Sequence, residues 1–425
     1  MDEPKTESLL APYRVLDLTD EKGYLCGETL GSLGADVIKI EKPGGDVARS
    51  IGPFYKDIPI PENSLYWIAT NINKRGITLD IETADGKALF KQLVDKAHVV
   101  LESYPPGYME GLGLGYEALC KINSQIVVTS ITPFGQMGPY KDFKGSDLVL
   151  WAMGGELYPS GDPERAPTQI SSPHQAYFNG SIQAAQATIA ALYHSEMTGE
   201  GQQVDVSIQQ AVAQLAQQGI EYWYSSRNLL KRVGQYFPRL RPAPLGPLNL
   251  RLLWPCKDGY VCFRMAAGVD AASMKSAKNM IAVLDRHGVC GFLKSYDWEQ
   301  YDWQTITQQE QEQLEKPFLD YFATKTKAEL YEEALNENII LAPVATAEDL
   351  VESPQLAARE FWEQVEHHDF TNVITYPGAF AKISETPIKI RRRAPLIGEH
   401  NEDVYVNELG LSILKLAELE KALVV

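Results

Sequence analysis

The sequence has no excess of basic residues. Its 39 Lys and Arg residues are outnumbered by 56 Asp and Glu residues, which gives a formal net charge of -17. Nucleic acids and anionic membrane surfaces are bound by fields of Lys and Arg, so this balance argues against both as partners. The one dense basic cluster, KIRRR at residues 389–393, is interpreted as a solvated strand end, with an anion or partner contact as the alternative.

Cysteines are also few, and several functional motifs are missing. The five cysteines contain no C-x-x-C pair, no signal peptide is recognised, and no apolar run reaches the length of a membrane span. We therefore expect a cytoplasmic chain with reduced thiols, no membrane as a partner and no bound metal. The motifs H-E-x-x-H, G-x-x-x-x-G-K-[ST] and G-x-S-x-G are absent, which argues against zinc peptidases, P-loop proteins and one class of serine hydrolase.

What the chain does have is a large apolar content and a regular alternation of patterns. Of its 425 residues, 44% are apolar, which is ample for a large core. Up to about residue 210, strand-like stretches such as residues 36–41 alternate with helical ones such as residues 83–97, where Thr83 is a plausible N-cap. This β-α-β order predicts an α/β fold with a parallel sheet.

The middle of the chain reads differently. Residues from about 225 to 330 are rich in Pro, contain short strands and then become polar and helical, after which helix and strand alternate again. We therefore expect a discontinuous large domain with an N-terminal part at 1–220, a smaller α+β domain at 221–330, and a return segment at 331–425 that completes the large domain.

Several phrases, taken together and in order, resemble the class III CoA-transferase family, which includes the carnitine and formyl-CoA transferases. The carriers of this resemblance are VLDLT, LGADVIKIEKPGGD, NINKRGITLDI, VLESYPPG, ITPFGQMGPY, EMTGEGQQVDVS and APLIGEHNEDVYVNELGL, which run from residue 15 to residue 411. The resemblance implies an intertwined, ring-like dimer. It also implies a mechanism in which an aspartate attacks an acyl-CoA thioester and forms a mixed anhydride, from which CoA is passed on to an acceptor acid.

In the register that this resemblance gives, the nucleophilic aspartate falls on Ala176. The segment GDPERAPTQISSP fixes the register upstream, and Gly180 with the helix that follows fixes it downstream. A slipped register would recruit Asp162, which belongs to a GDPE turn where aspartate is common for structural reasons. The racemase branch of the family is not matched either, because its catalytic histidine and aspartate align with Ser146 and Ala176.

Other family features are changed as well. The family's NFRPG reads SYPPG here, with Ser103 for the asparagine and Pro105 for the arginine, and a CoA-contacting arginine of some members aligns with Gly111. Cationic residues nevertheless remain that are candidates to bind the phosphates of CoA. These are Lys42, Arg75 and Lys144, together with Lys74, and the alternative is that they are ordinary surface or strand-end residues.

The missing aspartate makes a heteromeric enzyme the leading hypothesis. The chain resembles an aspartate-lacking subunit that supports a homologous catalytic CoA-transferase subunit, with succinyl-CoA as the expected donor and a carboxylic acid such as benzylsuccinate as the acceptor. No covalently bound cofactor is expected, CoA enters as a thioester substrate, and whether this subunit binds it is open. Two alternatives stay open: a stand-alone acyl-CoA-binding or regulatory protein, and an enzyme with a relocated nucleophile.

Overall fold

The computed structural model describes residues 8–169, 173–239, 241, 246–265, 271–298, 300–367 and 372–425. The chain divides into two compact units. Unit 1 contains residues 1–157, 169–228 and 355–425, and unit 2 contains residues 158–168 and 229–354. The smaller unit therefore extends to residue 354, compared with the range 221–330 expected for the small domain. Whether the units are independently folding domains stays a prediction.

Unit 1 is built around a six-stranded parallel sheet in the order β3-β2-β1-β4-β5-β6. The expected α/β fold with a parallel sheet is thus confirmed. The strands are short, and β1 to β5 are almost entirely buried, as expected for a sheet covered on both faces, whereas the edge strand β6 is partly exposed. Their bounds are β1 Arg14–Leu18, β2 Asp36–Glu41, β3 Lys74–Thr78, β4 Val99–Glu102, β5 Val127–Thr132 and β6 Gln203–Ser207.

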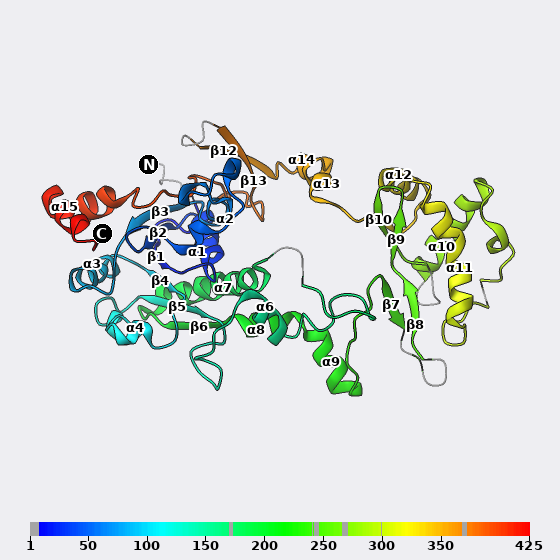
Figure 1. The fold of residues 1–425 in the computed structure, drawn as a ribbon, viewed down its shortest axis with the longest axis horizontal. Coiled ribbons are helices and arrows are strands. Elements are labelled where there is room, and N and C mark those ends of the chain that lie inside the picture. Colours follow the sequence, from blue (N-terminus) through cyan, green and yellow to red (C-terminus); the bar gives the residue numbers. More distant parts are fainter. Residues whose placement is uncertain are drawn as a thin grey trace. The chain divides into compact units, whose positions relative to one another are not determined.

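Helices cover both faces of this sheet (Figure 1). On one face, alternate strand residues such as Val15 and Val127 pack with α1, α6 and α7, and on the other face their neighbours Leu16 and Val128 pack with α3 and α15. The helices of unit 1 are α1 Tyr24–Ser32, α2 Leu65–Thr70, α3 Ala84–Asp95, α4 Tyr108–Gly111, α5 Tyr116–Leu119, α6 Asp147–Met153, α7 Gln175–Thr198, α8 Ile208–Leu215, α9 Gln217–Ser226 and α15 Ile413–Lys421.

Local sequence chemistry explains where these elements begin. The Oγ1 of Thr83 accepts a hydrogen bond from the backbone N–H of Gly86, which makes Thr83 the N-cap of α3 as the sequence predicted. The C-terminal segment adds an antiparallel pair, β12 Trp362–His367 with β13 Asn372–Pro377, and a π-helix at Glu402–Glu408. The short helix α14 Pro354–Ala358 spans the boundary between the units.

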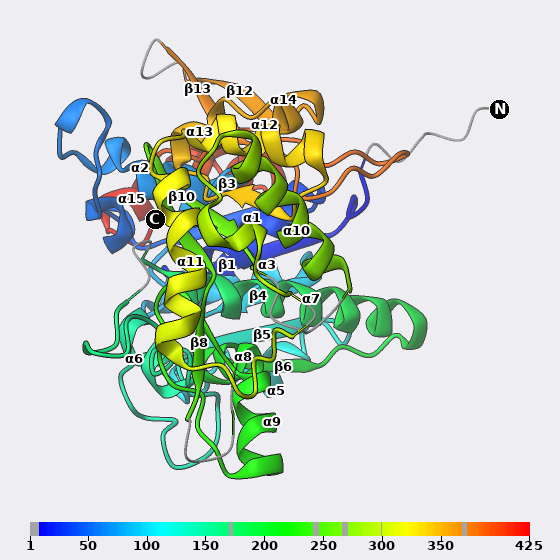
Figure 2. The ribbon, with the colours of Figure 1, turned by 90° about the vertical axis from the view of Figure 1, so that its right-hand side faces the viewer.

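Unit 2 combines antiparallel strands with helices, which are seen from another side in Figure 2. Its core is aromatic: Trp254 is fully buried and makes edge-on contacts with Phe263, Phe318 and Phe322. Its elements are β7 Tyr236–Arg239, β8 Leu248–Arg251, β9 Leu253–Cys256, β10 Gly259–Phe263, α10 Ala271–Arg286, α11 Gln308–Phe322, α12 Lys327–Glu337, β11 Leu341–Pro343 and α13 Ala347–Val351. Trp298 and Tyr301 also belong to this core.

In the part of the chain that the structure describes, no helix has both the length and the apolar character needed to cross a membrane.

Candidate functional site

The strand order points to one place in unit 1 where a ligand would bind. The order reverses between β1 and β4, and open parallel sheets bind ligands outside the carboxyl ends of the strands at such a reversal. Here the two strand ends are bridged, because Ser103 Oγ donates to Asp20 Oδ1 and accepts from the backbone N–H of Asp20, both at 2.8 Å. Ser103, which the sequence analysis aligned with a family asparagine, therefore lies at the expected ligand edge.

The N-terminus of α7 lies beside this edge. Ser181 of α7 donates its Oγ hydrogen to the backbone oxygen of Lys22, which is in the loop after β1. Ala176 is in the first turn of the helix, where the family's aspartate was expected, and its side chain is completely buried. That Ala176 occupies the family's nucleophile position stays a prediction from the sequence.

A carboxylate from another helix reaches this helix start. Asp147 is the first residue of α6, and its Oδ1 accepts hydrogen bonds from the backbone N–H groups of Ala176 at 2.8 Å and Tyr177 at 3.3 Å. The first N–H groups of a helix have no partner within the helix, and the positive end of the helix dipole favours a negative charge there. Sequence reasoning considered only the neighbours of Ala176 and Asp162, and it missed Asp147.

Aromatic and titratable side chains surround the same helix start. His174, the N-cap residue, has a left-handed backbone (φ 68°) and stacks on Tyr66 of α2 at 4.4 Å between ring centroids. Burial raises the pKa of Tyr66, and the charge of Glu21 raises it further. Burial also raises the pKa of Glu21, while His174 opposes this shift. Ionisation of Tyr66 is thus strongly disfavoured, so Tyr66 is not a phenolate nucleophile at neutral pH.

The candidate CoA-binding cations are not all at the carboxyl edge of the sheet. Lys42 directly follows β2 at the carboxyl edge of the sheet and forms an exposed 3.0 Å pair with Glu82, and the exposed Lys144 lies in the loop between β5 and α6. Arg75 pairs in register with Ile38, nearer the amino end of β2. It binds Asp36 and Glu408 at 2.6 Å each, so those carboxylates already use its charge.

Lys74 has a structural role. Its Nζ is completely buried and donates to Asp17 Oδ2 at 2.8 Å and to Asn71 Oδ1 at 2.9 Å. The fourth candidate cation is therefore enclosed in the core, where phosphate cannot reach it without a rearrangement.

The other sequence candidates are placed away from this site. Asp162 lies in an exposed turn of unit 2. The basic cluster at 389–393 forms no strand, so its interpretation as a strand end is wrong. All three of its arginines have partners within the chain: Arg391 donates to the backbone oxygens of Gly31 and Ser32, Arg392 lies 3.5 Å from His400 Nε2, and Arg393 binds Glu399.

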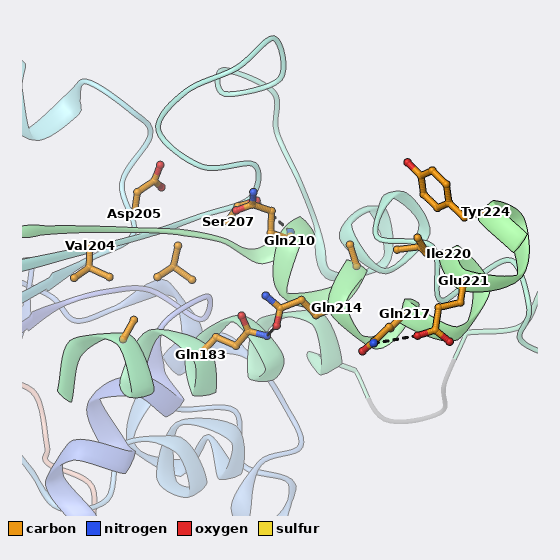
Figure 3. Close-up of a pocket in the computed structure, with 13 residues that line it drawn as sticks. Gln183, Val204, Asp205, Ser207, Gln210, Gln214, Gln217, Ile220, Glu221 and Tyr224 are labelled. Atoms are coloured by element: carbon orange, nitrogen blue, oxygen red, sulfur yellow. Dashed lines mark hydrogen bonds between the residues drawn. The ribbon is translucent and has the colours of Figure 1, made fainter. Parts of the chain in front are cut away.

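The pocket in Figure 3 has a volume of about 930 Å³ but does not include Ala176. It lies between β6, α7, α8 and α9, and Gln183 is the α7 residue labelled there. Among the described residues that line it are the carboxylates of Asp205 and Glu221 and no Lys, Arg or His. A polyanion such as CoA is therefore poorly matched to this pocket, so we place the candidate site at the start of α7. No cluster of three or more metal-ligating side chains occurs among the described residues.

Comparison with known proteins now decides the family. The sequence pattern of CoA-transferase family III matches residues 10–401. The chain belongs to CoA-transferase family III. It is 34% identical to the succinyl-CoA:(R)-benzylsuccinate CoA-transferase subunit BbsE of Thauera aromatica, over 93% of each chain. It is 28% identical to the succinyl-CoA–L-malate CoA-transferase beta subunit of Chloroflexus aurantiacus, over 97% of this chain and 96% of that one.

Solved structures of the family agree with the fold. A CAIB/BAIF family protein from Brucella suis superposes with a TM-score of 0.79 at 26% identity, covering 94% of this chain and 99% of that one. The α/β architecture with its parallel sheet is therefore the family III architecture.

The difference among the cations leads to a prediction. If this chain binds CoA through Lys42, as the sequence predicts, replacing Lys42 with alanine should weaken that binding about tenfold, since a hydrogen bond to a charged group contributes about 1.5 kcal/mol. The salt bridge between Lys42 and Glu82 is exposed and therefore weak, so it competes little with a phosphate for Lys42. Calorimetric titration of CoA into the purified protein measures the effect. The matched control is Lys316→Ala, which removes an exposed lysine of unit 2. Equal affinity in Lys42→Ala and the control would remove Lys42 from the CoA site.

Proposed function

We propose that this chain is the non-catalytic subunit of a heteromeric class III CoA-transferase. The enzyme moves CoA from an acyl-CoA, with succinyl-CoA as donor, to a carboxylic acid, with benzylsuccinate as the first acceptor to test. A homologous partner subunit supplies the nucleophilic aspartate. The two subunits assemble as an intertwined, ring-like hetero-oligomer, in which this chain completes the fold.

One observation supports this proposal above the others. The first turn of α7 carries the methyl group of Ala176, which is buried and cannot form an anhydride. The similarity to the BbsE subunit, whose name places it in a benzylsuccinate CoA-transferase, supports the choice of donor and acceptor.

The main competing function is an enzyme whose nucleophile is a residue other than residue 176, and Asp147 is a specific candidate for that nucleophile. Its Oδ1 accepts hydrogen bonds from two backbone N–H groups at the start of α7. For an enzyme with a relocated nucleophile, this carboxylate and that of Asp162 are the candidates to test. A stand-alone acyl-CoA-binding protein would need neither.

Expression of the chain with and without an aspartate-bearing homologue tests the proposal. We expect co-purification, transfer of CoA from succinyl-CoA to benzylsuccinate only by the pair, and a hydroxylamine-sensitive acyl adduct only on the partner. Replacing the partner's aspartate with alanine should abolish transfer. Turnover or an adduct on this chain alone would refute the non-catalytic role, and binding of acyl-CoA without any partner or turnover would favour the regulatory alternative.

A further inference from the structure

One edge of the parallel sheet is covered by a segment from the C-terminal part of the chain. β3 is the terminal strand in the order of the sheet, so every second residue of β3 turns its backbone groups outward. Residues 396–401, here called the edge segment, bind to these outward groups. They belong to one of the phrases that carry the family resemblance. An uncovered strand edge leaves N–H and C=O groups unpaired, so the edge segment completes the hydrogen bonding of the sheet.

The outward backbone groups of Gly76 and Thr78 all have partners in or beside the edge segment. The N–H of Gly76 donates to His400 Nδ1 at 3.1 Å, and its C=O accepts from the backbone N–H of His400 at 2.9 Å. The N–H of Thr78 donates to Asn401 Oδ1 at 2.9 Å, and its C=O accepts from the hydroxyl of Tyr405 at 2.7 Å. Of these four bonds, only the one to His400 Nδ1 has an acceptor that titrates near neutral pH.

The edge segment lies very close to β3 at this point. Gly76 is buried, and a β-carbon at its position would lie 2.8 Å from Pro395 Cβ and 3.2 Å from the backbone oxygen of Leu396. Such a close approach leaves no room for water to take over a lost hydrogen bond. If His400 Nδ1 stops accepting, the N–H of Gly76 therefore stays unpaired until the edge segment moves away.

We propose that the ring of His400 is a pH-sensitive latch, which holds the edge segment on β3 when the ring is neutral and releases it when the ring is protonated. A ring nitrogen that accepts a hydrogen bond carries no proton, so the proton of the neutral ring is on Nε2. Protonation adds a hydrogen to Nδ1, which then faces the N–H of Gly76 as one donor against another. The inference does not depend on the proposed function, since it concerns a sheet edge and not the start of α7.

The surroundings of His400 favour its neutral form. Burial lowers the pKa of His400, and the charge of Glu399 in the edge segment opposes this shift. Arg392, whose Nη1 lies 3.5 Å from His400 Nε2, lowers the pKa further, as does Arg75 on β3. Asp403 of the π-helix opposes the shift again. Because the folded pKa lies below the unfolded value of about 6.5, the stability that neutral His400 contributes is complete above pH 6.5. It is lost as the pH falls through the folded pKa.

Hydrogen exchange at the Gly76 amide tests the latch on the full chain, in the assembly in which the chain purifies. Rates at pH 7.5 and pH 5.0 are converted to protection factors, so that the intrinsic pH dependence of exchange cancels. The side chain of His400→Asn keeps an oxygen that can accept from Gly76 and does not titrate. Between the two pH values, we expect protection of Gly76 to fall about tenfold more in the unaltered protein than in His400→Asn, because leaving a buried N–H without an acceptor costs about that factor.

The matched control is His194→Asn, which removes an exposed histidine of α7 and should behave like the unaltered protein. An equal loss of protection in the unaltered protein and in His400→Asn would overturn the inference. Protection of Gly76 that is the same at both pH values in the unaltered protein would also overturn it, without any variant. CoA transfer is part of neither measurement, so the result is the same whether or not the proposed function holds.

If His400→Asn does not fold, Arg392→Gln gives the decision, because it leaves the ring and its bond to Gly76 in place. Removing this cation raises the pKa of His400 toward the unfolded value, so less protection depends on the neutral ring. We expect the loss of Gly76 protection at pH 5.0 to be at least about twofold smaller than in the unaltered protein. A loss that Arg392→Gln leaves unchanged would show that another group controls the opening and would overturn the inference.

Discussion

Replacing Lys74 with methionine should lower the free energy of unfolding by about 3–5 kcal/mol, because it leaves a buried aspartate without its cation. Lys74 and Asp17 are both completely buried, and Lys74 Nζ also donates to the backbone oxygen of Tyr24 at 2.9 Å. Although burial opposes ionisation of Asp17, the charges of Lys74 and then Lys39 hold its pKa below the usual value. Denaturant unfolding at pH 7.5 measures the effect.

Two comparisons make this result specific. Lys42→Met removes a lysine from an exposed pair, so it should change the free energy of unfolding by less than about 1 kcal/mol. The double variant Asp17→Asn/Lys74→Met removes both charges and should be more stable than Lys74→Met alone. If Lys74→Met were as mild as Lys42→Met, the buried pair would not be a stabilising element of the fold.

Replacing Glu102 with glutamine should stabilise the protein, and increasingly so as the pH rises. Burial raises the pKa of Glu102 to about 7, against hydrogen bonds from Ser130 and the backbone of Tyr104. When the pKa of a carboxyl is higher in the folded state than in the unfolded state, the free energy of unfolding of the protein falls as the pH rises. The fall occurs between the unfolded pKa, about 4.3, and the folded pKa. The advantage of glutamine should therefore grow from about 1 kcal/mol at pH 5 to about 3 kcal/mol at pH 7.

Denaturant midpoints across this pH range give the measurement. The exposed Glu117→Gln serves as the control and should stay within about 0.5 kcal/mol of the unaltered protein at each pH. Because glutamine can still accept from the backbone of Tyr104, the change removes charge and little else. A pH-independent difference between Glu102→Gln and the unaltered protein would mean that Glu102 does not titrate in this range.

Much of unit 1 could be predicted from the sequence because its determinants are local. The strand at Asp36–Glu41 is bounded by turn residues on both sides, and the Thr83 cap precedes an amphipathic run, so a short window contains the information. Ala176 was likewise found from motif spacing, and α7 does begin beside it. The alternation of strands and helices was enough to indicate the parallel sheet.

Contacts between side chains that are far apart in the sequence could not be predicted from local patterns. The predicted cations illustrate the reason: Lys74 and Arg75 look like neighbouring phosphate contacts, but strand alternation sends them to different environments, one buried against Asp17 and one bound to Asp36 and Glu408. Each carboxylate comes from another part of the chain.

The sequence by itself thus determined the family, the type of sheet and the absence of a carboxylate at residue 176, because these depend on residue order and spacing. Only the tertiary structure showed that the carboxylate of Asp147 binds the backbone N–H of Ala176. Asp147 is 29 residues from Ala176 and on a different helix, and it meets the start of α7 only because α6 and α7 pack on the same face of the sheet. The electrostatics of a site depends on distances in space, which spacing along the chain does not fix.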